Sequence, residues 1–135
     1  MKRILLTTAL VVLMSPAAHA NDCMEDAENQ AAMTQCAGQA YQASDAELNR
    51  LFHEIRQRLG DDADKWRLLR GAERAWIAFR DAECTFSASG VAGGSAYPMV
   101  YELCLDDLTQ KRIEELRQYL RCEEGDLSCP APPAE

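Results

Sequence analysis

Apolar residues recur every three or four positions along most of this 135-residue chain, the spacing of one face of an α-helix. The first such pattern predicts one long helix from about Ala27 to Leu59, ended by Gly60. Ser44 and Glu47 have the spacing of a capping box, which would instead start a new helix near position 43. The apolar pattern keeps its phase there, so one continuous helix is preferred. Its apolar positions are Met33, Cys36, Ala37, Ala40, Tyr41, Leu48, Leu51, Phe52, Ile55 and Leu59.

Two more helices are predicted, over about 64–87 and 99–120, with a glycine-rich loop at 89–97 between them. The inward positions of the second helix are expected to be Trp66, Leu69, Ala72, Trp76, Phe79, Glu83 and Phe86. Those of the third are expected to be Leu103, Leu105, Leu108, Ile113, Leu116, Tyr119 and Leu120. No segment shows convincing β alternation. The predicted fold is therefore all-α, a three-helix antiparallel bundle stapled by disulfides.

The amino terminus has the pattern of a secretory signal peptide. Lys2 and Arg3 precede a short apolar run, and Ala18-x-Ala20 forms a cleavage site. The prediction is a signal peptide at 1–20, a helical domain at 21–122, and a disulfide-closed turn with a disordered tail at 123–135. The mature protein is expected in the periplasm or secreted, without a membrane anchor.

All six cysteines follow the predicted signal peptide, so they are expected to form disulfides outside the reducing cytosol. Local spacing favours the pairs Cys23–Cys36, Cys84–Cys104 and Cys122–Cys129. Zinc is the competing interpretation, but a structural zinc site usually needs close pairs such as C-x2-C, and none occurs. No metal site is predicted. A bridge between the second and third helices would hold both ends of the glycine-rich loop.

The net charge and the motifs of the chain limit the classes of partner and activity to be expected. The chain carries a net charge of −8, and removal of the two basic residues of the signal peptide would make it −10. Such a charge argues against nucleic acid and anionic lipid and suits a basic partner. The predicted mature chain has a single histidine, His53, and lacks a G-x-S-x-G elbow, a P-loop and a dinucleotide fingerprint. No catalytic residue and no cofactor is predicted, and the protein is not expected to be an enzyme.

The most unusual stretch is 74–84, where Trp76 and Arg80 lie one helical turn apart. One interpretation is a recognition surface. The other, which we prefer, is a buried tryptophan beside an arginine that pairs with a carboxylate. Asp45 and Glu83 are the candidate partners of Arg80.

Several segments together resemble the LprI-type lysozyme-inhibitor family, over nearly all of 23–120. They are Cys36-Ala37, Ala43-x-Asp45-x-x-Leu48-Asn49, Arg74-Ala75-Trp76-Ile77-x-Phe79-Arg80-Asp81-Ala82-Glu83-Cys84, Gly93-Gly94-Ser95-x-x-Pro98, Cys104-Leu105 and Leu108-Thr109-x-x-Arg112-x-x-x-Leu116. The resemblance implies a small helical, disulfide-bonded periplasmic or surface domain. In at least one branch of the family it implies inhibition of lysozyme.

The leading hypothesis is a protein that binds a peptidoglycan-cleaving hydrolase, with a basic lysozyme or another cell-wall hydrolase as its partner. Gly93, Gly94, Ser95 and Tyr97 are the predicted contact residues, because a protruding loop can enter a carboxylate-lined cleft. The alternative is an envelope stress or maintenance factor, or a toxin-immunity protein, that binds another periplasmic protein.

Overall fold

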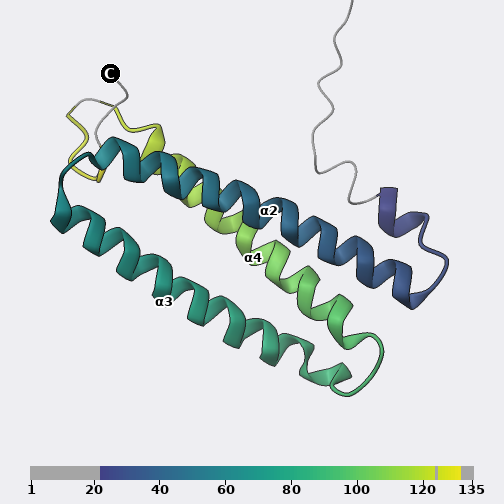
Figure 1. The fold of residues 1–135 in the computed structure, drawn as a ribbon. Coiled ribbons are helices and arrows are strands. Elements are labelled where there is room, and N and C mark those ends of the chain that lie inside the picture. Colours follow the sequence, from purple (N-terminus) through teal and green to yellow (C-terminus); the bar gives the residue numbers. More distant parts are fainter. Residues whose placement is uncertain (1–21, 124, 132–135) are drawn as a thin grey trace, which may run out of the picture.

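The computed structural model describes residues 22–123 and 125–131, and these form an all-α fold. The main helices are α2 (Gln30–Leu59), α3 (Ala63–Ser87) and α4 (Tyr97–Leu120), and the short 3-10 helix η1 (Ala88–Val91) follows α3. α3 runs antiparallel to both α2 and α4 (Figure 1). The predicted three-helix fold is confirmed. The predicted signal peptide lies outside the described residues.

Local sequence explains where α2 begins and ends. The side chain of Asn29 accepts a hydrogen bond from the backbone N–H of Ala32 at 3.0 Å, which caps the first turn. Gly60 ends the helix with a φ of 55°, a conformation that favours glycine. Ser44 does not cap a helix. It lies in the middle of α2 with a buried side chain, and its hydroxyl donates a hydrogen bond to the backbone carbonyl of Tyr41. The prediction of one continuous helix is therefore correct.

The apolar core lies mainly between α2 and α4, which pack side by side (Figure 1). Its fully buried members are Leu48, Leu51, Ile55, Leu59, Ile113, Leu116 and Ala131. Ala131 is only 1% exposed, although a disordered tail was predicted from position 130 onward. The C-terminal turn therefore contributes to the core. Residues 132–135 lie outside the described residues.

The inner face of α3 agrees only in part with the prediction: Trp66, Leu69 and Trp76 face inward as expected, but the other predicted positions do not. Phe79 and Phe86 were expected in the core, yet they are 55% and 75% exposed, and Ala72 and Glu83 also face solvent. The residues that α3 turns inward are Trp66, Leu69, Glu73, Trp76, Arg80 and Cys84. Glu73 and Arg80 can occupy the inner face because each finds a charged partner there, which offsets the cost of burying its own charge.

Three disulfides staple this fold: Cys23–Cys36, Cys84–Cys104 and Cys122–Cys129, with Cα–Cα distances of 5.7, 5.5 and 5.5 Å. These are the pairs that local spacing favours. Such bridges indicate an extracytoplasmic compartment, since thiols stay reduced in the cytosol. Among the described residues, no helix has the length and apolar character required to cross a bilayer.

Candidate functional site

The loop between α3 and α4 is a series of tight turns. The N–H of Ala92 donates to the carbonyl of Ser89 at 3.1 Å, that of Gly94 to Val91 at 3.0 Å, and that of Tyr97 to Gly94 at 3.2 Å. Gly93 has a φ of 77°, which disfavours any residue with a side chain. The loop is thus held by its own backbone hydrogen bonds as well as by its ends.

Both ends of this loop are anchored. The disulfide Cys84–Cys104 joins the last turns of α3 to the first turns of α4, and Ala88 is fully buried. At the other end, the ring of Tyr97 stacks on that of Tyr101, with centroids 5.9 Å apart and planes 13° apart. The segment 92–95 between these anchors is exposed.

The structure therefore places three of the predicted contact residues, Gly93, Gly94 and Ser95, on the surface of one turn. Tyr97 is half-buried because it stacks on Tyr101, so it presents only part of its ring to solvent. This end of the molecule, which also holds the start of α2, lies opposite the α2–α3 turn and the Cys122–Cys129 turn (Figure 1).

Behind the loop, the buried Arg80 is the centre of a cluster of partly exposed charged and aromatic side chains. Its guanidinium carbon lies 5.1 Å from the centroid of the Trp76 ring and 5.4 Å from that of Tyr41. One terminal nitrogen lies 3.6 Å from a carboxylate oxygen of Asp45, and the other lies 2.9 Å from Asp81. Trp76, Arg80 and Asp45 thus meet in the structure, and Arg80 is only 6% exposed. Trp76 is partly buried against the core, and Arg80 pairs with carboxylates as the structural interpretation of the 74–84 segment expects.

Spacing alone did not reveal Asp81 as the nearer partner of Arg80. Adjacent residues on a helix point in different directions, and the side chains meet only because the Arg80 guanidinium folds back toward Asp81. Glu83, the other candidate, is exposed and forms no ion pair with any residue that the structure describes.

Two tyrosines, Tyr41 and Tyr101, feel the charges of this cluster. Burial raises the pKa of Tyr41, and the charges of Asp45 and Asp81 raise it further, although Arg80 opposes them. Burial and the charge of Asp81 likewise raise the pKa of Tyr101. Tyr101 also stacks on Tyr97, which fixes the C-terminal end of the loop on the first turns of α4.

A second buried ion pair lies along α3. Arg112 of α4 reaches Glu73 at 3.2 Å and Glu115 at 2.8 Å, and its guanidinium carbon lies 5.9 Å from the Trp76 ring. Trp76 therefore contacts two guanidinium groups, one from its own helix and one from α4. Helical periodicity does not reveal this pair, because Glu73 and Arg112 are 39 positions apart.

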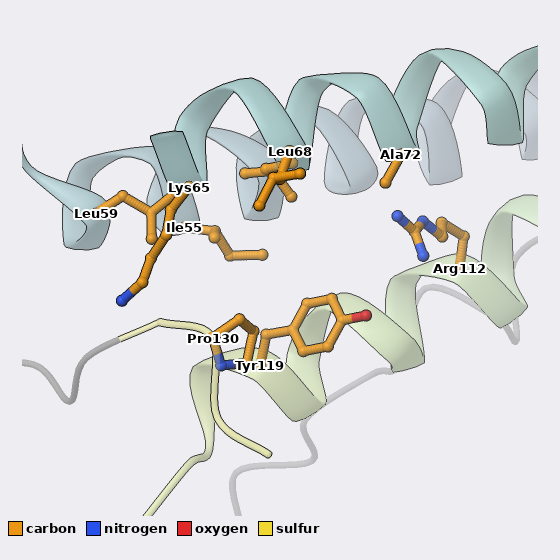
Figure 2. A pocket seen from close by; sticks show the side chains of 9 residues that line it. Ile55, Leu59, Lys65, Leu68, Ala72, Arg112, Tyr119 and Pro130 are labelled. Atoms are coloured by element: carbon orange, nitrogen blue, oxygen red, sulfur yellow. The ribbon is translucent and has the colours of Figure 1, made fainter. Parts of the chain in front are cut away.

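An apolar recess lies at the opposite end of the molecule. It has a volume of about 220 Å³ and is enclosed by α2, α3, α4 and the C-terminal turn (Figure 2). Its lining residues are Ile55, Leu59, Lys65, Leu68, Leu69, Ala72, Arg112, Tyr119 and Pro130. The recess is smaller than a typical small-molecule site. Across residues 22–123 and 125–131, no three His, Cys, Asp or Glu side chains form a group that could hold a metal ion.

The fold and the loop define a class: a small, all-helical, disulfide-stapled extracytoplasmic domain that presents an anchored loop. The sequence model of the family described as lysozyme inhibitor LprI matches residues 20–116, so the chain belongs to this family. The chain is also 35% identical to an uncharacterized protein of Rhizobium meliloti (strain 1021), in an alignment that covers 87% of this chain and 96% of that protein. No solved structure matches the chain significantly.

Proposed function

We propose that the protein is a periplasmic or secreted inhibitor that binds a peptidoglycan-cleaving hydrolase, with a basic lysozyme as its first target. The observation that carries this proposal is membership of the lysozyme-inhibitor family over residues 20–116. The disulfides support it, because they belong to the compartments in which lysozymes act. The family role requires binding rather than turnover, so no catalytic residue is assigned.

We propose the loop at 92–97 as the inhibitory contact. Its exposed turn carries little side-chain bulk at Gly93 and Gly94, so the backbone can approach a cleft closely. The hydroxyl of Ser95 can donate a hydrogen bond to a carboxylate, the group that glycoside hydrolases use for catalysis. Because both ends of the loop are anchored, binding loses little conformational entropy.

Charge supports the choice of a basic target. The predicted mature chain has a net charge of −10. At this end of the molecule Glu83 is exposed beside Cys84, and the carboxylate of Glu102 lies next to Gly38 of α2. Long-range attraction then accelerates encounter with a basic protein, and it weakens as salt rises.

Lysis of a cell-wall suspension by a basic lysozyme tests the proposal. We expect the mature protein to slow lysis at near-stoichiometric concentration and at physiological salt. The double variant Ser95→Ala/Tyr97→Ala keeps the net charge unchanged and should raise the half-inhibitory concentration at least roughly tenfold, which corresponds to about 1.4 kcal/mol.

Two control variants separate loop contact from loop damage. Ser89→Ala removes an exposed hydroxyl earlier in the same segment, and Tyr97→Phe retains the ring that stacks on Tyr101. Both should inhibit nearly as well as wild type. If the double variant inhibits as strongly as wild type, the loop is only a connector. If correctly folded wild type does not inhibit, the hydrolase-inhibitor function is refuted.

A further inference from the structure

α3 presents an apolar stripe to solvent on a face that neither α2 nor α4 covers. Its large members are Leu68, Phe79 and Phe86, which are 63%, 55% and 75% exposed. Ala72, Ala75 and Ala82 complete it and are also exposed. The intervals between successive members alternate between four and three residues, which is the spacing of a coiled-coil seam. The stripe runs from Leu68 to Phe86, a rise of about 27 Å along the helix.

We propose that two copies of the protein associate through this stripe, with their α3 helices antiparallel. The stripe is symmetric about position 77, so an antiparallel copy aligns every member with another member. Phe86 then lies opposite Leu68, Ala72 opposite Ala82, and Phe79 opposite Ala75. In the central pair a large side chain meets a small one, which allows close packing between two copies of one surface.

The apolar recess supports this register. Leu68 and Ala72 form the α3 edge of the recess (Figure 2). Because Phe86 of a second copy lies opposite Leu68, its exposed ring sits at the mouth of this apolar hollow. A Phe ring that is 75% exposed and an apolar recess that needs a cover are thus brought together twice in one symmetric dimer.

The charges of α3 favour association through this helix rather than through the more acidic remainder of the surface. α3 contains five basic and four acidic residues, whereas the predicted mature chain has a net charge of −10. Two copies therefore meet without strong repulsion between their α3 helices. The positions Gly71, Ala78 and Thr85, which flank one side of the stripe, are small and uncharged and let the helices approach.

The exposed area indicates a reversible dimer. At roughly 200 Å² for a whole Phe side chain, Phe79 and Phe86 together expose about 260 Å² per copy. A pair of copies would bury about twice this area from phenylalanine alone. Leu68, the alanines and the flanking positions bring the total toward the about 1,200 Å² at the lower end of stable interfaces.

Sedimentation velocity of the mature protein tests the proposal. We expect a concentration-dependent monomer–dimer equilibrium in the micromolar range. Phe79→Ser/Phe86→Ser should weaken dimerisation at least tenfold with unchanged helical circular dichroism, because both side chains are mostly exposed in the monomer. Ile77→Ser is the matched control: Ile77 is also exposed, at 38%, but it lies on the opposite side of α3 from the stripe, so the dimer should persist.

Cross-linking tests the register. All described cysteines are in disulfides, so an introduced cysteine provides the only free thiol among the described residues. Ala72→Cys and Ala82→Cys, when mixed, should be joined by a short bis-maleimide, whereas neither variant alone should dimerise covalently. A strictly monomeric wild type, a dimer that survives both serine substitutions, or cross-linking of Ala72→Cys to itself would each overturn the proposal.

Discussion

Arg80→Ala should destabilise the protein more than any other single replacement of an arginine on α3. Arg80 has a side chain that is only 8% exposed, and it contacts two carboxylates and two aromatic rings. The variant removes all four contacts and leaves a gap beside Trp76. Asp45 and Asp81 remain 40% and 47% exposed, so water can solvate the carboxylates that lose their partner.

We expect Arg80→Ala to lower the free energy of unfolding by about 3 kcal/mol. The hydrogen bond to Asp81 is charge-assisted, but solvent screens it, so it contributes about 1.5 kcal/mol. The two ring contacts and the packing of the arginine stem contribute a similar amount. For a domain of about 100 residues, the melting temperature should fall by roughly 10–15 °C. Arg80→Lys, which keeps the charge but not the flat guanidinium, should lose about half as much.

Thermal unfolding followed by circular dichroism, with disulfides intact, measures these differences. Arg74→Ala is the matched control, because Arg74 is an exposed arginine on the same helix and should shift the melting temperature by no more than about 2 °C. An Arg80→Ala variant that melts like the control would show that the cluster contributes little to stability. If that variant also lost lysozyme inhibition, the cluster would belong to a recognition surface.

Two further substitutions test other parts of the fold. A hydrogen bond from Arg50, together with one from Arg117, lowers the pKa of Glu47 to about 2. A lowered pKa gives stability that is complete above the ordinary carboxyl pKa and is lost as pH falls through the lowered value. Glu47→Gln should therefore cost about 1 kcal/mol at pH 7, after allowance for the exposed arginines, and only a small part of that at pH 2. An equal loss at both pH values in chemical denaturation would contradict this. Thr109 is fully buried, and its hydroxyl has no partner among the described residues, so Thr109→Val should raise the unfolding free energy by about 1 kcal/mol; a decrease would reveal a bound water or another unseen partner.

Helix positions were predictable because local signals set them. Asn29, Gly60 and Pro98 lie at or beside helix ends, and the apolar phase of α2 alone showed that Ser44 starts no helix. The cysteine pairs follow from short loops and helix ends that face each other. Each of these features depends on residues close together in the sequence.

The inner face of α3 could not be predicted in the same way. Trp66, Leu69 and Trp76 were assigned to the inner face correctly, but the apolar Phe79 and Phe86 moved the rest of the predicted face toward the solvent side. The correct face contains Glu73 and Arg80, which become favourable inside only when Arg112 and Asp45 from other helices are present. Their pairing depends on tertiary structure, so periodicity does not reveal it.

The charged inner face of α3 also relates the proposed loop contact to the proposed dimer surface. Because ion pairs and Trp76 hold α3 from the inside, its outer apolar stripe is free for a second copy. The stripe ends at Phe86, and the exposed loop begins six residues later, beyond the Cys84–Cys104 disulfide. Antiparallel α3 helices then place the two loops at opposite ends of the dimer, where each can contact its own hydrolase. Dimerisation should therefore leave the affinity of each loop unchanged, but it should increase retention on a surface that carries many hydrolase molecules, because a second contact becomes intramolecular.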